Sequence, residues 1–529
     1  MSRSKIPCTP EQKRALGSFR AGNPPGHRTT EFDFVVVGAG SSGCIVANRL
    51  SQNHQVLLIE AGSETVQSPL VSSFLQCRAL QKTEWDWQFN ITPQEHLDSR
   101  RIAWPRGRGL GGSSILNYMV YNRGAAQIYD AWAEELASGS WSYEELLPLF
   151  KRSECNSEFG EPYHGLTGEM HVGPCPVKSP YRELFLEGAT VLGFKADEMH
   201  DFNGLQQHDV AGFYQHTVRD GGRCSAADAF IRSSELKNLQ ISCSSLAYRI
   251  NLEELQATSV EFVEADGTLV QARARKEIVV CAGAIDTPKL LMLSGIGPAE
   301  SLQRFDIPVK VANEWVGKNL SDHPVVQLVH PAKAQVPAGD IPLGGLFLHS
   351  ERNKQQTALP PADLQLHPYL FPSREAAMVC LGVTLVGPES RGRIELASSD
   401  VLDKPWIQPN YLSDPRDMEK LHSGVRVALE LAGTEPFQRL IEGPVMQFES
   451  TTEDVAIQAG IRKTLSTIFH PMGTCRMGQE NNSVVDRELQ VHGVKGLRVA
   501  DASVFPRPVN ANTQAACMLV GEKAAALIH

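Results

Sequence analysis

The sequence predicts an α/β protein in which a discontinuous Rossmann-like domain is joined to a second, α+β domain built on an antiparallel sheet. A strand, glycine loop, helix and second strand follow one another over residues 32–60, and further strand-like runs lie at 277–282 and 496–501. These short apolar runs end in small or acidic residues, as is typical of central parallel strands. Residues 306–415 instead combine many prolines with alternating apolar residues, which favours antiparallel strands.

The length and charge of the chain limit its possible partners. At 529 residues the chain is too long for one compact core, so we expect about two to four domain-sized units. A net charge of −10 is mild for this length and gives no electrostatic reason to bind nucleic acid or an anionic membrane. The longest nearly uncharged apolar run, residues 376–388, is shorter than the ~20 residues that cross a bilayer, so we expect no integral membrane segment.

Two further features suggest where the protein works. The eleven cysteines are scattered and form no C-x-x-C pair, which indicates reduced thiols, a cytoplasmic location and no metal site. Residues 1–30 are polar and lack the apolar core of a secretory signal. We expect this segment to be a frayed tail, with the remnant of a transit peptide as the alternative.

The first βαβ unit carries the fingerprint of a dinucleotide site. Gly38, Gly40 and Gly43 have the spacing that permits a tight turn, close approach to a pyrophosphate, and packing of a helix on a strand. The helix that follows presents its free N-terminal amides, near Ser41 and Ser42, to the phosphates. Glu60, 22 residues after Gly38, is spaced to bind ribose hydroxyls. The fingerprint alone does not distinguish NAD from FAD.

A second glycine-rich loop spans residues 107–117. It combines exposed backbone amides with the hydroxyls of Ser113 and Ser114 and the amide of Asn117. Such a loop suits a flat polar heterocycle or another part of a dinucleotide. On local physics alone, a tight surface turn before a helix is the alternative.

Helices and one more strand are expected towards the C-terminus. Residues 417–431 and 454–467 have apolar residues at three- and four-residue spacing, which predicts helices. Residues 515–528 predict a terminal helix after the strand at 496–501. If the three strand-like runs share a sheet, the nucleotide domain is assembled from N-terminal, middle and C-terminal segments.

Four blocks spread over nearly the whole chain resemble the glucose–methanol–choline (GMC) oxidoreductases. Gly107–Asp130 resembles the first signature of that family, and Gly283–Gly297 resembles the second. The N-terminal fingerprint is the third block, and His470–Cys475 together with Asn510–Gln514 forms the fourth. The resemblance implies FAD rather than NAD as the cofactor.

The resemblance also divides the chain into domains. It implies an FAD-binding domain built from residues 31–155, 215–305 and 462–529, after the tail of residues 1–30. The substrate-binding domain comprises residues 156–214 and 306–461.

The resemblance implies a set of residues that bind FAD. The ADP half would lie against Gly38, Gly40, Ser41, Ser42, Gly43, Glu60 and Ala61, with Ala247 near the adenine. The flavin and its linker would lie along Arg108, Gly112, Ser113, Asn117, Met119, Val120, Asp501, Ala502, Asn512 and Thr513. Some family members attach FAD covalently through a histidine just before the loop asparagine. Here that position is Leu116, so we expect non-covalent FAD.

His470 is the candidate catalytic base. Neutral imidazole, with an ordinary pKa of about 6.5, is suited to taking a hydroxyl proton at neutral pH. A structural role is the alternative, because a buried histidine before proline is more often structural. By resemblance Asn512 occupies the second catalytic position, where an amide orients the substrate oxygen but cannot act as a second base.

The resemblance implies FAD-dependent oxidation of a primary or secondary alcohol, a small molecule, to the carbonyl. The hydride would pass to the flavin, and O2 or a quinone or dye would reoxidise it. The alternative is a GMC-fold lyase or photodecarboxylase that uses FAD without net redox, although the pair His470-Pro471 favours alcohol oxidation.

Neither the alcohol, the electron acceptor nor the oligomeric state follows from the sequence. A choline site would need a carboxylate and an aromatic cage, which cannot be assigned here. Candidate pocket residues, each equally compatible with ordinary core, are Trp85, Trp87, Phe347, Tyr369 and Phe371.

Overall fold

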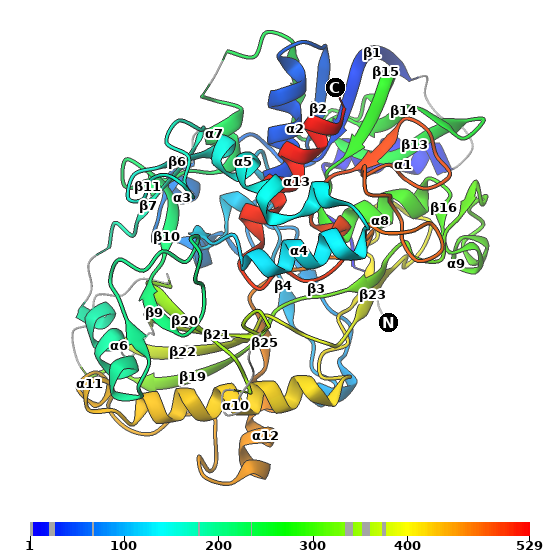
Figure 1. Cartoon of the computed structure of the whole chain (residues 1–529). Coiled ribbons are helices and arrows are strands. Elements are labelled where there is room, and N and C mark those ends of the chain that lie inside the picture. The colour runs from blue at the N-terminus through cyan, green and yellow to red at the C-terminus, as the bar shows by residue number, and fades with distance from the viewer. Residues whose placement is uncertain are drawn as a thin grey trace.

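The structure, a computed structural model, describes residues 4–20, 27–65, 68–177, 180–233, 235–333, 342–351, 360–372 and 377–528. Two sheets of seven strands dominate it, one in the upper and one in the lower half of the molecule as drawn in Figure 1. Each sheet is packed on its own large cluster of buried apolar side chains. The fold class expected from the sequence is confirmed.

The first sheet has the strand order β12-β2-β1-β15-β14-β13, with β26 paired to β15. β1 (Arg28–Val37) runs parallel to both β2 (Val56–Ile59) and β15 (Leu269–Val280), and β26 (Leu497–Val499) is parallel to the end of β15. The three strand-like runs seen in the sequence therefore share one sheet. β12 (Leu239–Ser242), β13 (Leu246–Glu253) and β14 (Gln256–Val263) complete it.

Two helices from opposite ends of the chain pack together beside this sheet. α2 (Ser41–Ser51) starts at the glycine loop after β1, and α13 (Thr513–Leu527) lies next to it (Figure 1). They approach closely because residue 521 is glycine. A Cβ added there would be 2.8 Å from the carbonyl oxygen of Ser42. α8 (Gly283–Leu293) begins just after β15, so its N-terminus also reaches the carboxyl edge of the sheet.

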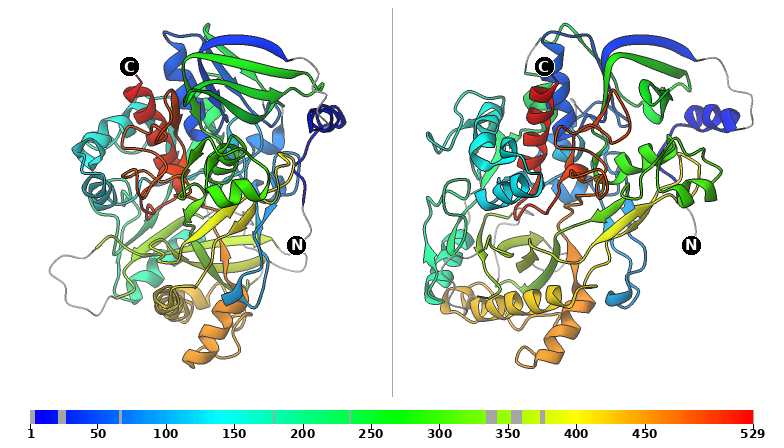
Figure 2. Two further views of the ribbon diagram at one scale, coloured as in Figure 1. Left: turned by 90° about the vertical axis from the view of Figure 1, so that its right-hand side faces the viewer. Right: turned by 45° about the vertical axis from the view of Figure 1, so that its right-hand side comes forward.

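The second sheet has the order β25-β19-β22-β21-β20-β9-β8 and is almost entirely antiparallel. Its strands are β8 (Lys195–Ala196), β9 (Val210–Phe213), β19 (Pro324–Pro331), β20 (Gly344–Leu348), β21 (Leu364–Pro372), β22 (Ala377–Leu385) and β25 (Ser466–Thr467). The long helix α10 (Pro415–Ala432) runs along its outer face (Figures 1 and 2). α10 begins where the Asp414 side chain accepts a hydrogen bond from the backbone of Arg416.

α12 (Asp454–Thr464) ends three residues before the expected boundary, and the next residues form β25 instead. The remaining helices are α3 (Pro69–Ser72), α4 (Ala126–Glu135), α5 (Tyr143–Ser153), α6 (Pro180–Val191), α7 (Ala226–Phe230), α9 (Ala299–Arg304) and α11 (Glu435–Gln438). The remaining strands are β3 (Phe89–Asn90), β4 (Ala103–Trp104), β5 (Val120–Tyr121), β6 (Glu154–Asn156), β7 (Met170–Pro174), β10 (Gln215–Arg219), β11 (Gly222–Arg223), β16 (Ile296–Gly297), β17 (Val311–Ala312), β18 (Lys318–Leu320), β23 (Gly392–Glu395) and β24 (Trp406–Gln408).

The N-terminal segment differs from the frayed tail that its polarity suggested. It contains α1 (Pro10–Arg20), which contacts β14 of the first sheet and lies at the periphery of the molecule (Figure 2). Ile6 and Leu16 are buried in a small apolar cluster with Leu402. The segment is polar on average, but these two buried apolar residues pack it against the protein.

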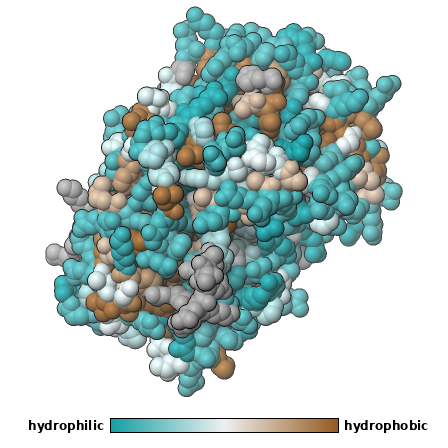
Figure 3. Space-filling model, viewed as in Figure 1, coloured by the Kyte–Doolittle hydropathy of each residue, from teal (hydrophilic) through white to brown (hydrophobic). Residues whose placement is uncertain are grey.

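No helix among the described residues is long and apolar enough to cross a membrane. The face of the molecule drawn in Figure 3 is mainly hydrophilic, with hydrophobic residues in scattered patches.

Candidate active site

Two adjoining cavities lie at the carboxyl ends of β1, β2 and β15. The first is bordered by the fingerprint loop, and the second extends to the antiparallel sheet. Ser41, Arg106, Ser113 and Cys517 line both. The carboxyl edge of a parallel sheet is where α/β folds of this kind bind ligands.

The two glycine loops form one wall of the first cavity. A Cβ added to Gly40 would meet no protein atom within 4 Å, so the backbone there is open to an incoming group. A Cβ on Gly112 would lie 2.6 Å from the Cα of Gly40, so the second loop packs directly on the first. The N-termini of α2 and α8 also reach this cavity, through Ser41, Ser42 and Gly283. Free amides beside an open backbone suit a pyrophosphate.

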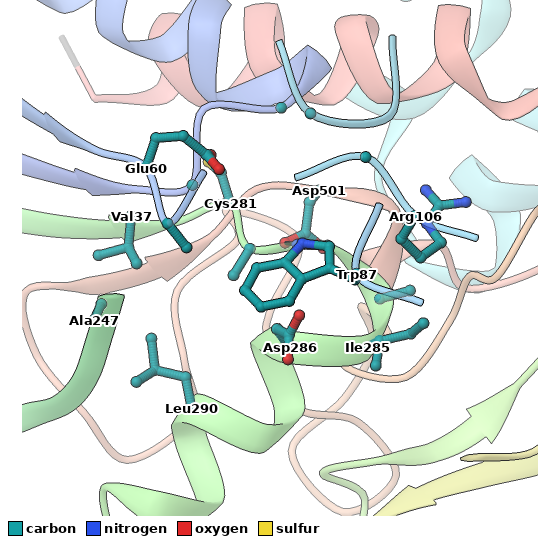
Figure 4. A pocket seen from close by; sticks show the side chains of 18 of the residues that line it. Val37, Glu60, Trp87, Arg106, Ala247, Cys281, Ile285, Asp286, Leu290 and Asp501 are labelled. Carbon is teal, nitrogen blue, oxygen red and sulfur yellow. Dashed lines mark hydrogen bonds between the residues drawn. The ribbon is translucent and has the colours of Figure 1, made fainter. Parts of the chain in front are cut away.

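Two acids are held at fixed positions on the cavity wall (Figure 4). Glu60 accepts hydrogen bonds from the backbone amides of Ala39, at 3.0 Å, and Gly62, at 2.7 Å. Asp501 accepts from the amide of Gly283, at 2.9 Å, and from the hydroxyl of Thr287, at 2.6 Å. Burial raises the pKa of both carboxyls. Glu60 accepts one bond at each carboxylate oxygen, and Asp501 Oδ1 accepts one, from the amide of Ser503, so each acid keeps a lone pair for ligand hydroxyls.

Apolar side chains close the other side of the first cavity. Trp87 stands near the centre of Figure 4, with Ala247 and Leu290 to its left. Ile6, from the N-terminal segment, and Val401 also line it. A polar cradle at one end and an apolar slot at the other match the phosphates and the base of a dinucleotide.

His470 and Asn512 lie side by side on the wall of the second cavity. Asn512 Nδ2 is 3.5 Å from His470 Nε2, and the two residues come from segments 42 residues apart in the chain. Asn512 directly precedes α13, so Thr513 and Gln514 present the positive N-terminus of that helix to the cavity. The buried atoms Asn512 Oδ1 and Gln514 Nε2 have no protein partner. These unpaired polar atoms, together with the helix N-terminus, suit a polar heterocycle such as a flavin ring.

A buried carboxylate holds the backbone of His470 in place. Asp322 Oδ1 accepts from the amide of His470, at 2.7 Å, while Oδ2 accepts from the hydroxyls of Thr467, at 2.5 Å, and Tyr411. The preceding residue, Phe469, has φ +64°, a left-handed conformation that is uncommon for a bulky residue. The Phe469 carbonyl in turn accepts from Arg106 Nη1 at 2.6 Å. The surrounding hydrogen bonds therefore impose the strained turn that points His470 into the cavity.

The imidazole of His470 is neutral in this setting. Burial lowers its pKa well below the ordinary value, and His323, Arg106 and His367 act in the same direction. A neutral imidazole with an unprotonated nitrogen is able to accept a proton.

The structure places most of the sequence-predicted site residues on the two cavities. The first is lined by Gly38, Gly40, Ser41, Ser42, Glu60, Ala61, Gly112, Ser113, Ala247, Asp501 and Ala502. The second is lined by Ser113, Asn117, Met119, Val120, His470, Asn512 and Thr513.

Gly43 and Arg108 do not line either cavity. A Cβ on Gly43 would lie 1.9 Å from the carbonyl oxygen of Gly38, so this glycine allows α2 to pack against the loop. Arg108 donates to the carbonyl of Ala61 at 3.0 Å and lies over the Trp87 ring. Both residues support the cavity wall from behind.

The candidate pocket aromatics are distributed differently. Tyr369 lines the second cavity, and Trp87 lines the first. Phe347 is fully buried in a small core cluster, and Trp85 packs on another. The side chain of Phe371 lies outside the described residues.

Sequence reasoning missed Arg106, Asp322 and His323. Arg106 directly precedes the second glycine loop, so its place beside that motif was a usable signal. Asp322 and His323 stand in a polar pair before Pro324, far from any recognised block. They reach the site through strand pairing, for which the sequence carries no local sign.

Comparisons with known proteins agree with this geometry. Two family models, both described as GMC oxidoreductase, match residues 32–325 and 388–521. An alcohol dehydrogenase [acceptor] of Pseudomonas putida is 36% identical over 531 residues, 94% of this chain and 95% of that protein. A mitochondrial choline dehydrogenase of Mus musculus is 34% identical over 541 residues, 94% of this chain and 89% of that protein.

One solved structure similar to this chain is of a formate oxidase of Aspergillus oryzae, and it concerns the effect of the mutation R554K on FAD modification. That structure has a TM-score of 0.88 and 26% identity, and the match covers 95% of this chain and 99% of that chain.

Proposed function

The chain belongs to the GMC oxidoreductase family, and on that premise we propose that it oxidises an alcohol to the carbonyl with non-covalently bound FAD. The observation that carries the proposal is the position of the His470 imidazole, which lines the second cavity with Asn512 at its side. FAD, when bound, accepts the hydride. The first cavity would hold its ADP half and the second its flavin together with the substrate.

His470 has the role of the base. Its unprotonated nitrogen takes the proton of the substrate hydroxyl, while the carbon–hydrogen bond releases a hydride and the C–O bond becomes a carbonyl. Asn512 donates a hydrogen bond to the substrate oxygen and so holds it beside His470. The alcohol thus loses two electrons and two hydrogens, one as a proton and one as a hydride.

Leu116 supports non-covalent attachment. It lines the second cavity, where its aliphatic side chain offers no nucleophile to the flavin. Release of free FAD from acid-denatured protein, with no flavin left on the polypeptide, is the expected result.

The first test is His470→Ala. We expect kcat to fall by at least ~10²-fold, the usual contribution of a positioned acid–base group, with FAD content unchanged. The measurement is the rate of flavin bleaching by a panel of aliphatic, aryl, sugar and amino alcohols without oxygen.

His422→Ala is the matched control, because that histidine pairs with Asp454 on the outer helices. Near-normal turnover in His470→Ala would refute the base assignment. No bleaching of the wild-type enzyme by any alcohol, combined with cyanohydrin cleavage or light-dependent CO2 release, would favour the lyase or photodecarboxylase alternative. Reoxidation by air, compared with a dye, then identifies the class of electron acceptor.

A further inference from the structure

A second histidine lies on the side of His470 that faces away from Asn512. His323 is fully buried, and its Nδ1 is 2.9 Å from Nδ1 of His470. The two rings meet edge to face, with an interplanar angle of 79°. The contact follows from strand pairing. Pro324, at the start of β19, is the partner of Thr467 in β25, and Ser321 bonds to Met472, so the two segments run antiparallel past each other.

This contact restricts where the proton of His470 resides. Two neutral imidazoles joined through their Nδ1 atoms share a single proton, with one nitrogen as donor and the other as acceptor. If His470 donates, its Nε2 is unprotonated and faces Asn512 Nδ2 and the cavity. If His323 donates, Nε2 of His470 carries the proton and cannot accept one from a substrate.

The surroundings of the two rings favour the first arrangement. Burial lowers the pKa of His323 to about 3, so the ring is neutral. The amide nitrogen of Asn512, 3.5 Å from Nε2 of His470, can only donate, so it favours an unprotonated Nε2. The proton of neutral His470 is then on Nδ1, and Nδ1 of His323 is the acceptor.

We propose that His323 is a positioning residue that keeps the proton of His470 on Nδ1 and so leaves Nε2 free to accept the substrate proton. The inference rests on the proposed role of His470 as base. It assigns His323 no contact with substrate or cofactor, because the ring lies behind His470 and is not part of either cavity wall.

Loss of His323 would remove the partner that holds the proton on Nδ1 of His470. The groups that face His470 are His323, Arg106 and His367, while Asp322 bonds to its backbone amide. Without the acceptor on Nδ1, a larger share of neutral His470 carries its proton on Nε2, so transfer of the substrate proton slows.

The test uses His323→Phe and His323→Asn, each alone and combined with His470→Ala. Phenylalanine keeps a ring but removes the acceptor. Asparagine can place its amide oxygen near the lost Nδ1. We expect His323→Phe to slow flavin reduction about 10- to 100-fold with FAD still bound. His323→Asn should recover a substantial part of the rate.

The double variant separates positioning from structural damage. Since His323 acts through His470, His323→Phe should cause no further loss when His470 is already alanine. An equal loss in both backgrounds, with no recovery of the rate in His323→Asn, would overturn the proposal. Near-normal turnover in His470→Ala would instead refute the role of His470 as base. Failure of the His323 proposal and failure of the proposed function therefore give different results.

A measurement on the wild-type holoenzyme keeps the proposal testable if His323→Phe does not fold. The ¹⁵N chemical shifts of a histidine distinguish a protonated from an unprotonated ring nitrogen, and the His470 signals are those missing in His470→Ala. We expect a protonated Nδ1 and an unprotonated Nε2. The reverse pattern would contradict the proposal.

Discussion

Gly40 and Gly43 lie in the same turn, yet an added methyl group would meet different surroundings at each. At Gly40 the Cβ would point into open space with no protein atom within 4 Å, and at Gly43 it would stand 1.9 Å from the carbonyl oxygen of Gly38. The backbone of Gly40, with φ −80° and ψ −167°, is accessible to alanine. Glycine is therefore needed at position 40 to leave space for a ligand, and at position 43 to let α2 pack against the loop.

This contrast predicts two different failures. Gly40→Ala should leave the stability of the apoprotein within ~0.5 kcal/mol of wild type but weaken FAD retention, because the methyl group occupies the space for the pyrophosphate. Gly43→Ala should lower the free energy of unfolding by about 1–3 kcal/mol or more through overpacking. Thermal unfolding of the apoproteins and FAD content of the purified holoproteins measure the two effects. Full FAD content in Gly40→Ala would contradict the assignment of that loop.

At the scale of elements, the sequence predicted where single strands and helices lie, but it did not predict which distant strands pair. β2 begins and ends where its apolar run does, and α10 and α13 differ by only one or two residues from the helices expected at 417–431 and 515–528. Glycine spacing and helical periodicity are local, so they can be read from a short window. The contact of His323 with His470 depends on the pairing of β19 with β25, which joins residues more than a hundred positions apart. Neither segment contains a pattern that reveals its partner.

The N-terminal segment is an element whose role the sequence concealed. Its backbone pairs with the loop at residue 403, and Lys5 Nζ lies 2.6 Å from Asp400 and 2.8 Å from Asp403. Ile6 is 3% exposed and lines the first cavity beside Val401. The segment therefore covers the apolar end of the cavity that we assign to the ADP half of FAD.

Removal of this cover should loosen the cofactor. Ile6→Ser replaces a buried side chain worth about 1.5–3 kcal/mol of apolar burial, so we expect FAD affinity to fall about tenfold or more. The temperature at which FAD fluorescence appears on heating should drop accordingly. Glu11→Ala is the control, since the exposed Glu11–Arg14 pair contributes little to stability. Equal FAD release temperatures in wild type and Ile6→Ser would show that the segment does not retain the cofactor.

At the scale of the whole molecule, the second cavity is formed where the two sheets meet. Asn117, Met119 and Val120 come from the nucleotide side, and Gln327 and Gln365 come from the antiparallel sheet. Among the described residues that line it are two arginines, Arg78 and Arg106, and no aspartate or glutamate. Three tyrosines, at positions 118, 214 and 369, also line it. The cavity is thus aromatic and polar, with a positive rather than a negative charge.

That charge pattern bears on the substrate, because the relatives include a choline dehydrogenase. A buried quaternary ammonium needs a carboxylate or an aromatic cage to replace its hydration, and two guanidinium groups oppose it. We therefore expect 3,3-dimethyl-1-butanol, the neutral isostere of choline, to reduce the flavin with a kcat/KM at least about tenfold higher than that of choline. A difference of that size corresponds to about 1.4 kcal/mol. Because shape and hydroxyl are the same in both alcohols, the ratio reports charge alone. A preference for choline would contradict this expectation and would mean that the tyrosines outweigh the arginines.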